Sequence, residues 1–260
     1  MKTWLGILAL YLLLALAAGL GGFTPELPAP GEAQVDQAPS AEAWFGTDTL
    51  GRDLFAQTIQ GIKVALSVGS LAASLAILLG ALFGILSGWY RGPVDGLILW
   101  LSSSVAAIPG ILLVLVLSWM LGGSYVGVFV AVGLVSWVSV YRLVRIEVQR
   151  LQAEPFVDAA RLQGAPTGFL MLRHLVPNLT PVLLPQFLLH FLYAVKAEAI
   201  LSFLGIGMQG HTSWGTMIAD AWAYDDLGHG RWWRLAAATG AMAILILALQ
   251  RIAMRLEARK

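Results

Sequence analysis

The sequence predicts an all-α integral membrane protein with about six transmembrane helices. Its 260 residues are 58% hydrophobic and only 12% charged, which is about half the charged fraction of an ordinary soluble domain. A hydrocarbon core about 30 Å thick needs roughly 20 apolar residues in a helix. Six apolar runs of suitable length cover roughly residues 3–22, 62–90, 97–121, 125–144, 183–206 and 235–252.

The composition excludes several classes of protein. The net charge is +1 and the basic residues form no dense tract, so the chain has no electrostatic footprint for nucleic acid. With no cysteine, it has no disulfide, thiolate metal site or cysteine nucleophile. Its four histidines lack metal-ligand spacing, and no G-x-x-x-x-G-K-[ST] or G-x-S-x-G motif is present. We therefore expect no enzyme activity and no cofactor or metal bound by this chain.

The chain divides into a first apolar helix over residues 1–22, a segment over 23–61 rich in Pro, Gly and acidic residues, and a core over 62–260. The first run also fits a cleaved signal peptide, because Lys2 precedes an apolar stretch and Ala15-Leu16-Ala17 resembles a small-residue cleavage site. Cleavage would leave five spans and an external N-terminus.

The distribution of Lys and Arg predicts the orientation, because basic flanking loops stay in the cytoplasm. With the N-terminus inside, the inside segments hold Lys2, Arg91, Arg142, Arg145, Arg150, Arg161, Arg173, Arg251, Arg255, Arg259 and Lys260. The outside holds only Arg52, Lys63, Arg231 and Arg234. We therefore expect both termini and a polar loop over residues 145–182 to be cytoplasmic, and the 23–61 segment to be external.

That polar loop predicts a compact helix–turn–helix. Pro155 suits the first turn of a helix, and good helix formers follow it. Gly164 can take the left-handed conformation that ends a helix. Thr167 then caps a second short helix over 168–176, and Pro177 stops it.

The residues of this loop also resemble a known motif. Asp158-Ala159-Ala160 is followed after three residues by Gly164, and after nine more by His174-Leu175-Val176-Pro177. This is similar to the EAA loop of ABC importer permeases, E-A-A, x3, G, x9, I-x-L-P, with Asp158 in place of the usual Glu. The resemblance implies a coupling helix that docks on an ATP-binding subunit and transmits its closure to the membrane helices. The implied coupling interface contains Glu154, Phe156, Asp158, Ala159, Ala160, Gly164 and Pro177.

Other segments resemble the C-type permeases of dipeptide, oligopeptide and nickel importers. They follow the order and spacing of that family between about residues 45 and 220, whereas residues 23–43 and the stretch after Asp220 depart from it. The matching segments are 45–53, 88–92, 107–109, 136–145, 173–178, 198–207 and 213–220.

This resemblance implies a type I ABC importer permease fold in a bacterial or archaeal cytoplasmic (inner) membrane. It also implies three kinds of partner: a second permease subunit, two ATP-binding subunits that use ATP and Mg, and an external solute-binding protein. The expected substrates are dipeptides or oligopeptides, and nickel or another small solute is the alternative. An ATP-independent channel or secondary transporter would show inverted repeats or interrupted helices, and a membrane-embedded enzyme would show a polar catalytic cluster at one depth. We find neither pattern in the sequence.

Two charged residues lie within an apolar span. Lys196 and Glu198 are costly there and, two residues apart, point to different faces of a helix. We expect at least one of them to face the translocation path or the partner permease. The alternative is that Glu198 lies near the outer end and is merely hydrated.

The sequence singles out two further patterns. Asp48, Arg52 and Asp53 form an external cluster that would orient a substrate-delivery protein or, as we favour, cap a helix through side-chain bonds to the backbone. Gly80, Gly84 and Gly88 are spaced by four residues. Such small residues let two helices approach closely in lipid, so this run predicts a helix-packing surface.

Overall fold

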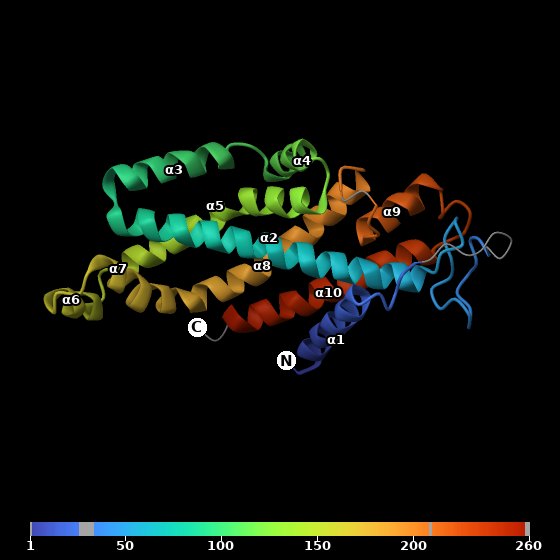
Figure 1. Cartoon of the computed structure of the whole chain (residues 1–260), viewed down its shortest axis with the longest axis horizontal. Coiled ribbons are helices and arrows are strands. Elements are labelled where there is room, and N and C mark those ends of the chain that lie inside the picture. The colour runs from blue at the N-terminus through green and yellow to red at the C-terminus, as the bar shows by residue number, and fades with distance from the viewer. Residues whose placement is uncertain (1, 26–33, 208–209, 258–260) are drawn as a thin grey trace.

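The structure, a computed structural model, describes residues 2–25, 34–207 and 210–257, which are mostly helical (Figure 1). Residues 26–33 of the expected external segment, and Arg259 and Lys260, lie outside the described residues. The elements in chain order are α1 (Lys2–Gly19), α2 (Leu54–Tyr90), α3 (Gly92–Ala106), α4 (Gly110–Met120), α5 (Tyr125–Leu151), α6 (Pro155–Leu162), α7 (Thr167–Phe169), the π-helical η1 (Leu170–Leu175), α8 (Val176–Phe203), α9 (Trp214–Ala223) and α10 (Trp233–Glu257).

The helices form an elongated bundle whose two ends differ (Figure 1). The helices α6 and α7 lie at one end of the long axis, and α9 lies towards the other end with the segment before α2. At 1.5 Å per residue, α2 is about 55 Å long. It therefore exceeds a hydrocarbon core of about 30 Å, and its ends must project beyond the apolar layer.

Four helices are long and apolar enough to cross a membrane. They are Leu54–Tyr90, Tyr125–Leu151, Thr167–Phe203 and Trp233–Leu256. A fifth span is present if α3 and α4 together count as one, whereas α1 is a shorter apolar helix. The all-helical membrane fold is thus as predicted, and the number of about six spans stays a prediction.

The third apolar run is not one continuous helix. The helices α3 and α4 meet at an angle of 89°, and the break contains Ala107, Ile108 and Pro109. Proline disfavours the helical conformation of the residue before it and has no N–H to donate, so it favours a break at this point. The expectation that the chain holds no interrupted helix is therefore wrong for this run.

The second helix of the polar loop is also longer than predicted. Thr167 makes no capping bond, and the helix that it opens continues through η1 into α8 as far as Phe203. Pro177 does not stop it, because this proline falls in the first turn of α8, just after the π-helical segment. The proline is tolerated there because it has no N–H to donate at the point where the hydrogen-bond spacing changes from five residues to four.

The most extensive helix contact joins α2 to α5. Three glycines of α2 face three valines of α5, in the pairs Gly80 with Val140, Gly84 with Val144 and Gly88 with Val148. A Cβ atom at Gly84 would lie 2.6 Å from the Cβ of Val144 and 3.0 Å from the backbone oxygen of Tyr141. The two backbones therefore approach more closely than any larger residue allows, and this packing fixes α2 and α5 as one unit.

We predict that Gly84→Ala destabilises the protein, because the added methyl group has no space against Val144. Overpacking of this kind costs about 1–3 kcal/mol. The thermal unfolding midpoint in detergent, followed by tryptophan fluorescence, should fall. Gly240→Ala is the matched control, since nothing lies within 4 Å of its Cβ position in α10 and alanine favours a helix by about 0.5–1 kcal/mol over glycine. Equal midpoints for the two variants would contradict the packing argument.

Candidate functional site

The helix α6 has the boundaries that the sequence predicts. Pro155 lies in its first turn, and Gly164, with φ of +80°, follows its last turn. The N–H of Gly164 donates to the oxygen of Arg161 at 2.9 Å, and the N–H of Ala165 donates to the oxygen of Ala160 at 3.1 Å. These two bonds form a Schellman motif, which requires a left-handed residue at the position of Gly164. The turn after α6 is therefore fixed by local chemistry.

Buried apolar side chains lie in α6 and at its base, where the helix contacts η1. Val157 is the fully buried residue of the helix. Leu151 at the end of α5 and Leu175 in η1 are buried in one cluster with Val144 and Val148. Because these valines also face the glycines of α2, the base of the loop is continuous with the α2–α5 contact.

The outer surface of this end exposes four large apolar side chains. Leu162 is 90% exposed and Leu172 is 73% exposed, and Phe156 and Phe169 are also exposed. The ring of His174 lies between the two aromatic residues, with centroids 6.1 Å from Phe156 and 5.6 Å from Phe169. We call Phe156, Leu162, Phe169 and Leu172 the coupling patch. Large exposed apolar side chains gathered on a polar loop are typical of a surface that binds another protein.

The structure places most of the implied coupling residues around this patch. Asp158 and Ala159 are exposed on α6, and Asp158 pairs with Arg161 at 3.3 Å. Glu154 precedes the helix and Ala160 is half-buried on it. Pro177 instead belongs to α8. Leu162, Phe169 and Leu172 were missed from the sequence, although large apolar residues in a polar loop were the available signal.

Polar contacts connect α6 to the end of α2. The guanidinium group of Arg161 lies over the ring of Trp89, 5.1 Å from its centroid. Gln152, which follows α5, donates to the backbone oxygen of Trp89 at 3.1 Å and accepts from Arg91 at 3.4 Å. Trp89 at the end of α2 thus contacts both α6 and the residue that follows α5.

An ion pair joins α3 to the same end of the bundle. Arg145 of α5 donates to both carboxylate oxygens of Asp95 at 2.6 Å, a bidentate geometry that is among the stronger kinds of ionic contact. Ser87 of α2 also donates to Asp95 and lies 3.3 Å from the hydroxyl of Tyr141. The helices α2, α3 and α5 thus meet at one polar junction.

At the opposite end of the bundle, Asp48 organises the segment before α2. Its carboxylate accepts bonds from the backbone N–H of Leu50 and Arg52, from the Arg52 guanidinium at 2.7 Å and from Gln57 at 2.8 Å. Burial alone would raise the pKa of Asp48, but these hydrogen bonds outweigh burial and lower it below its usual value. Asp53 is the N-cap of α2 and accepts from the N–H of Phe55 at 2.9 Å. This is the geometry that the capping interpretation expects.

A second ionic cluster at this end was not found from the sequence. Arg231 pairs with Asp36 and, at 3.2 Å, with Asp226, and Arg234 lies 3.4 Å from Asp226. Arg234 and Asp226 are only 2% and 1% exposed. The cluster fastens the segment before α2 to the start of α10. No local pattern indicates it, because Asp36 and Arg231 lie 195 positions apart.

The two charged residues of α8 lie on different faces. Glu198 is only 2% exposed and accepts from the hydroxyl of Ser202 at 2.7 Å, which disagrees with the interpretation of a hydrated carboxylate. Lys196 is exposed. It belongs to a stripe of partly or fully exposed residues at spacings of three and four, namely Leu189, Tyr193, Lys196, Ile200 and Phe203.

Comparison with known proteins places the chain among membrane permeases. The oligopeptide transport system permease protein OppC of Bacillus subtilis (strain 168) is 35% identical over 187 residues, which cover 72% of this chain and 61% of that protein. The dipeptide transport system permease protein DppC of the same strain is 34% identical over 239 residues, covering 90% and 74%. The match to OppC thus spans less than two thirds of that relative's length.

A solved structure and a family model agree with the similarity to these two relatives. A crystal structure of an amino acid ABC transporter with histidines aligns with a TM-score of 0.54 at 17% identity, covering 79% of this chain and 95% of that one. This likeness supports the fold alone. The family described as binding-protein-dependent transport system inner membrane component matches residues 80–260, a range that contains α6, the coupling patch and the α8 stripe. The chain therefore belongs to this family of inner-membrane permeases of ABC transport systems.

Proposed function

We propose that this chain is the transmembrane permease subunit of an ATP-driven importer of dipeptides or oligopeptides, coupled to ATP-binding subunits through residues 154–177. The coupling patch carries this proposal, because an exposed apolar surface held on a rigid base suits a docking helix. The relatives named for oligopeptide and dipeptide transport support the substrate class. Nickel or another small solute is the alternative cargo within the same architecture.

The contacts around α6 explain how docking would move the membrane helices. ATP and Mg belong to the partner subunits, whose closure would push on the coupling patch. The contact of α6 with η1 and the Arg161–Trp89 contact would pass that displacement to α8 and α2. Because α2 and α5 are locked by glycine–valine packing, they move as one body rather than bending. The result is a rigid-body switch between inward-open and outward-open arrangements.

Half of the translocation pathway would come from this chain and half from a second permease subunit. The α8 stripe containing Lys196 is a candidate for the face towards the pathway or towards that subunit. In this arrangement the α6 end and both termini lie in the cytoplasm. The opposite end, with Asp48 and the Asp226 cluster, faces an external solute-binding protein.

The coupling patch predicts the effect of Leu162→Asp. Burying a leucine is worth about 1.5–3 kcal/mol, so a charge at this position should weaken binding to the ATP-binding subunit at least about tenfold. Co-purification with co-expressed partner subunits in mild detergent, with ATPase activity recorded, measures this loss. Leu227→Asp is the matched control, because Leu227 is also exposed but lies between α9 and α10.

Two outcomes would contradict this proposal. Equal recovery of the ATP-binding subunit with both variants would remove the coupling patch from the interface. If no ATPase associates even with the wild-type chain, the ATP-independent channel or secondary transporter becomes the better hypothesis.

The α8 stripe predicts that the charge of Lys196 matters for transport. Lys196→Met should slow uptake of a labelled dipeptide in proteoliposomes about tenfold, since contacts of a charged group are worth about 1.5–3 kcal/mol. Lys196→Arg, which keeps the charge, should transport at close to the wild-type rate. Assembly with the partner subunits is checked for both variants, and a wild-type rate in the methionine variant rules out this role.

The contacts of Asp48 predict a pH-dependent contribution to stability. At pH 7, Asp48→Asn should lower the free energy of unfolding by about 1–3 kcal/mol, because the variant loses the charged bond to Arg52. A lowered folded-state pKa stabilises the protein above the unfolded value, about 3.9 for Asp, and this contribution disappears as the pH falls through the folded value.

The difference between wild type and Asp48→Asn should therefore be large at pH 7 and shrink towards pH 3. Thermal unfolding midpoints across this range measure it. Glu42→Gln, at an exposed position of the same segment, is the control and should change little. A difference that does not depend on pH would show that the charge of Asp48 is not the source of its effect.

A further inference from the structure

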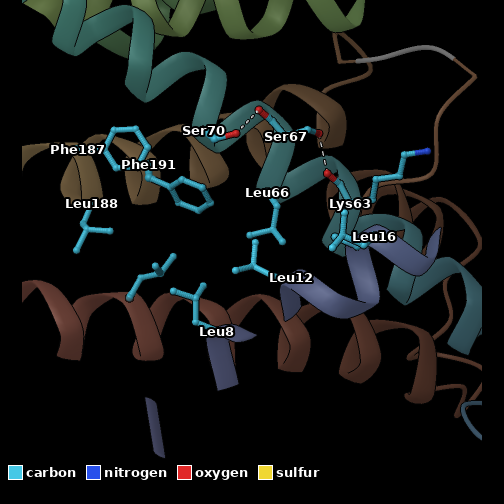
Figure 2. Close-up of a pocket in the computed structure, with 12 residues that line it drawn as sticks. Leu8, Leu12, Leu16, Lys63, Leu66, Ser67, Ser70, Phe187, Leu188 and Phe191 are labelled. Carbon is cyan, nitrogen blue, oxygen red and sulfur yellow. Dashed lines mark hydrogen bonds between the residues drawn. The ribbon is translucent and has the colours of Figure 1, made fainter. Parts of the chain in front are cut away.

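A groove of about 440 Å³ opens on the side of the bundle (Figure 2). Three residues of α1, Leu8, Leu12 and Leu16, form one wall, and Phe187 and Phe191 of α8 form part of the other. The groove exists because α1 packs chiefly on α2 and α10 and leaves a gap towards α8. Four helices therefore enclose a space that none of their own side chains fills.

The floor and walls of the groove are apolar. Leu66 of α2, Phe191 of α8 and Leu249 of α10 line it and are buried members of one hydrophobic cluster. Figure 2 shows Leu66 and Leu12 pointing towards each other from opposite helices. The hydroxyls of Ser67 and Ser70 donate to backbone oxygens of their own helix, so they leave no free donor to demand a polar ligand. The interior thus suits a hydrocarbon chain.

One basic residue, Lys63, lies at one end of the groove. Lys63 lines it beside Leu16 and is exposed, and its side chain extends outward, away from Leu12 and Leu66 (Figure 2), with no ion pair among the described residues. At 1.5 Å per residue, Lys63 lies about 14 Å from the start of α2, and Ser70 lies about 10 Å further along. The cation is therefore at the end of the groove nearer to α9, and the apolar lining extends from it towards the middle of the bundle.

This arrangement matches the chemistry of a phospholipid. Lipid phosphates lie at the edge of the hydrocarbon core, and lysine side chains near helix ends reach to that level. A partner helix would fill the apolar groove equally well, but it would give no reason for a cation at its end that pairs with no carboxylate of the described residues. An anionic headgroup attached to an acyl chain satisfies both features at once.

We infer that the groove between α1 and α8 is a binding site for one anionic phospholipid of the outer leaflet, whose acyl chain lies on Leu12, Leu66 and Phe191 and whose phosphate contacts Lys63. The lipid fills the gap between α1 and α8. This site is separate from the coupling patch and from the α8 stripe.

The test uses the full chain purified with its co-expressed partner subunits and exposed to phosphatidylglycerol and phosphatidylcholine. Native mass spectrometry counts the lipids retained after mild delipidation. Wild type should retain one phosphatidylglycerol and prefer it about fivefold, which corresponds to ~1 kcal/mol for one basic residue near an anionic headgroup. Lys63→Gln should bind both lipids equally, whereas Lys63→Arg should keep the preference.

A second pair of variants tests the groove itself. Ser70→Phe fills the groove and should abolish the retained lipid, while Ser74→Phe, one turn further along α2 at an exposed position outside the lining, should keep it. The proposal is overturned if wild type retains no lipid or if Lys63→Gln keeps the preference. Because the chain has no cysteine, Leu12→Cys also offers a single reactive thiol. Its cross-linking to a cysteine in the second permease subunit would show a protein helix in the groove and overturn the proposal.

Association with the ATP-binding subunit is measured in the same preparations. It should be unaffected by Lys63→Gln. The two measurements therefore distinguish an error in the lipid-site proposal from an error in the proposed importer function. A loss of that association in Lys63→Gln would contradict the separation of the two sites.

Discussion

The close packing of α2 on α5 is the contact on which the rest of the structure depends. In lipid no hydrophobic force drives two helices together, so van der Waals packing and short backbone distances must do so. Gly84 and Gly88 provide the short distance, and Val144 and Val148 provide the packing surface. Val148 also belongs to the buried cluster that contains Leu175 of η1. The packing of α2 on α5 therefore stabilises the bundle and supports the loop that carries α6.

The two ends of the bundle are fixed by different chemistry. Around α6, apolar contacts and the Asp95–Arg145 pair join helices that follow one another in sequence or that pack on the α2–α5 pair. At the α9 end, Asp226 and Arg234 are buried together, and Asp36 of the segment before α2 pairs with Arg231 of the same cluster. Such a buried pair stabilises little in itself, because desolvation offsets the attraction, but losing one partner is costly. Its effect is to hold one geometry at the end that would meet an external protein.

The sequence predicted those features that a few neighbouring residues determine. The limits of α6 follow from Pro155 and Gly164, whose effects act within one turn of the chain. The continuation through Pro177 was not predictable in the same way, because it depends on the π-helical spacing of the preceding residues. The Asp36–Arg231 pair was out of reach for another reason, since only the tertiary fold brings those residues together. The coupling residues were identified by resemblance, whereas the apolar neighbours beside them became evident only from exposure.

The position of α1 determines the width of the groove between α1 and α8. The hydroxyl of Tyr11 donates to the backbone oxygen of Ala241 at 2.9 Å, and α1 packs on α2 and α10 rather than on α8. A rearrangement of the bundle that shifts α8 relative to α2 and α10 would change the width of the gap between α1 and α8. A side chain packed across that gap would resist the motion, because protein interiors tolerate little change in volume. An acyl chain conforms to either width, so a lipid in the groove keeps the apolar surface covered in both arrangements without opposing the switch.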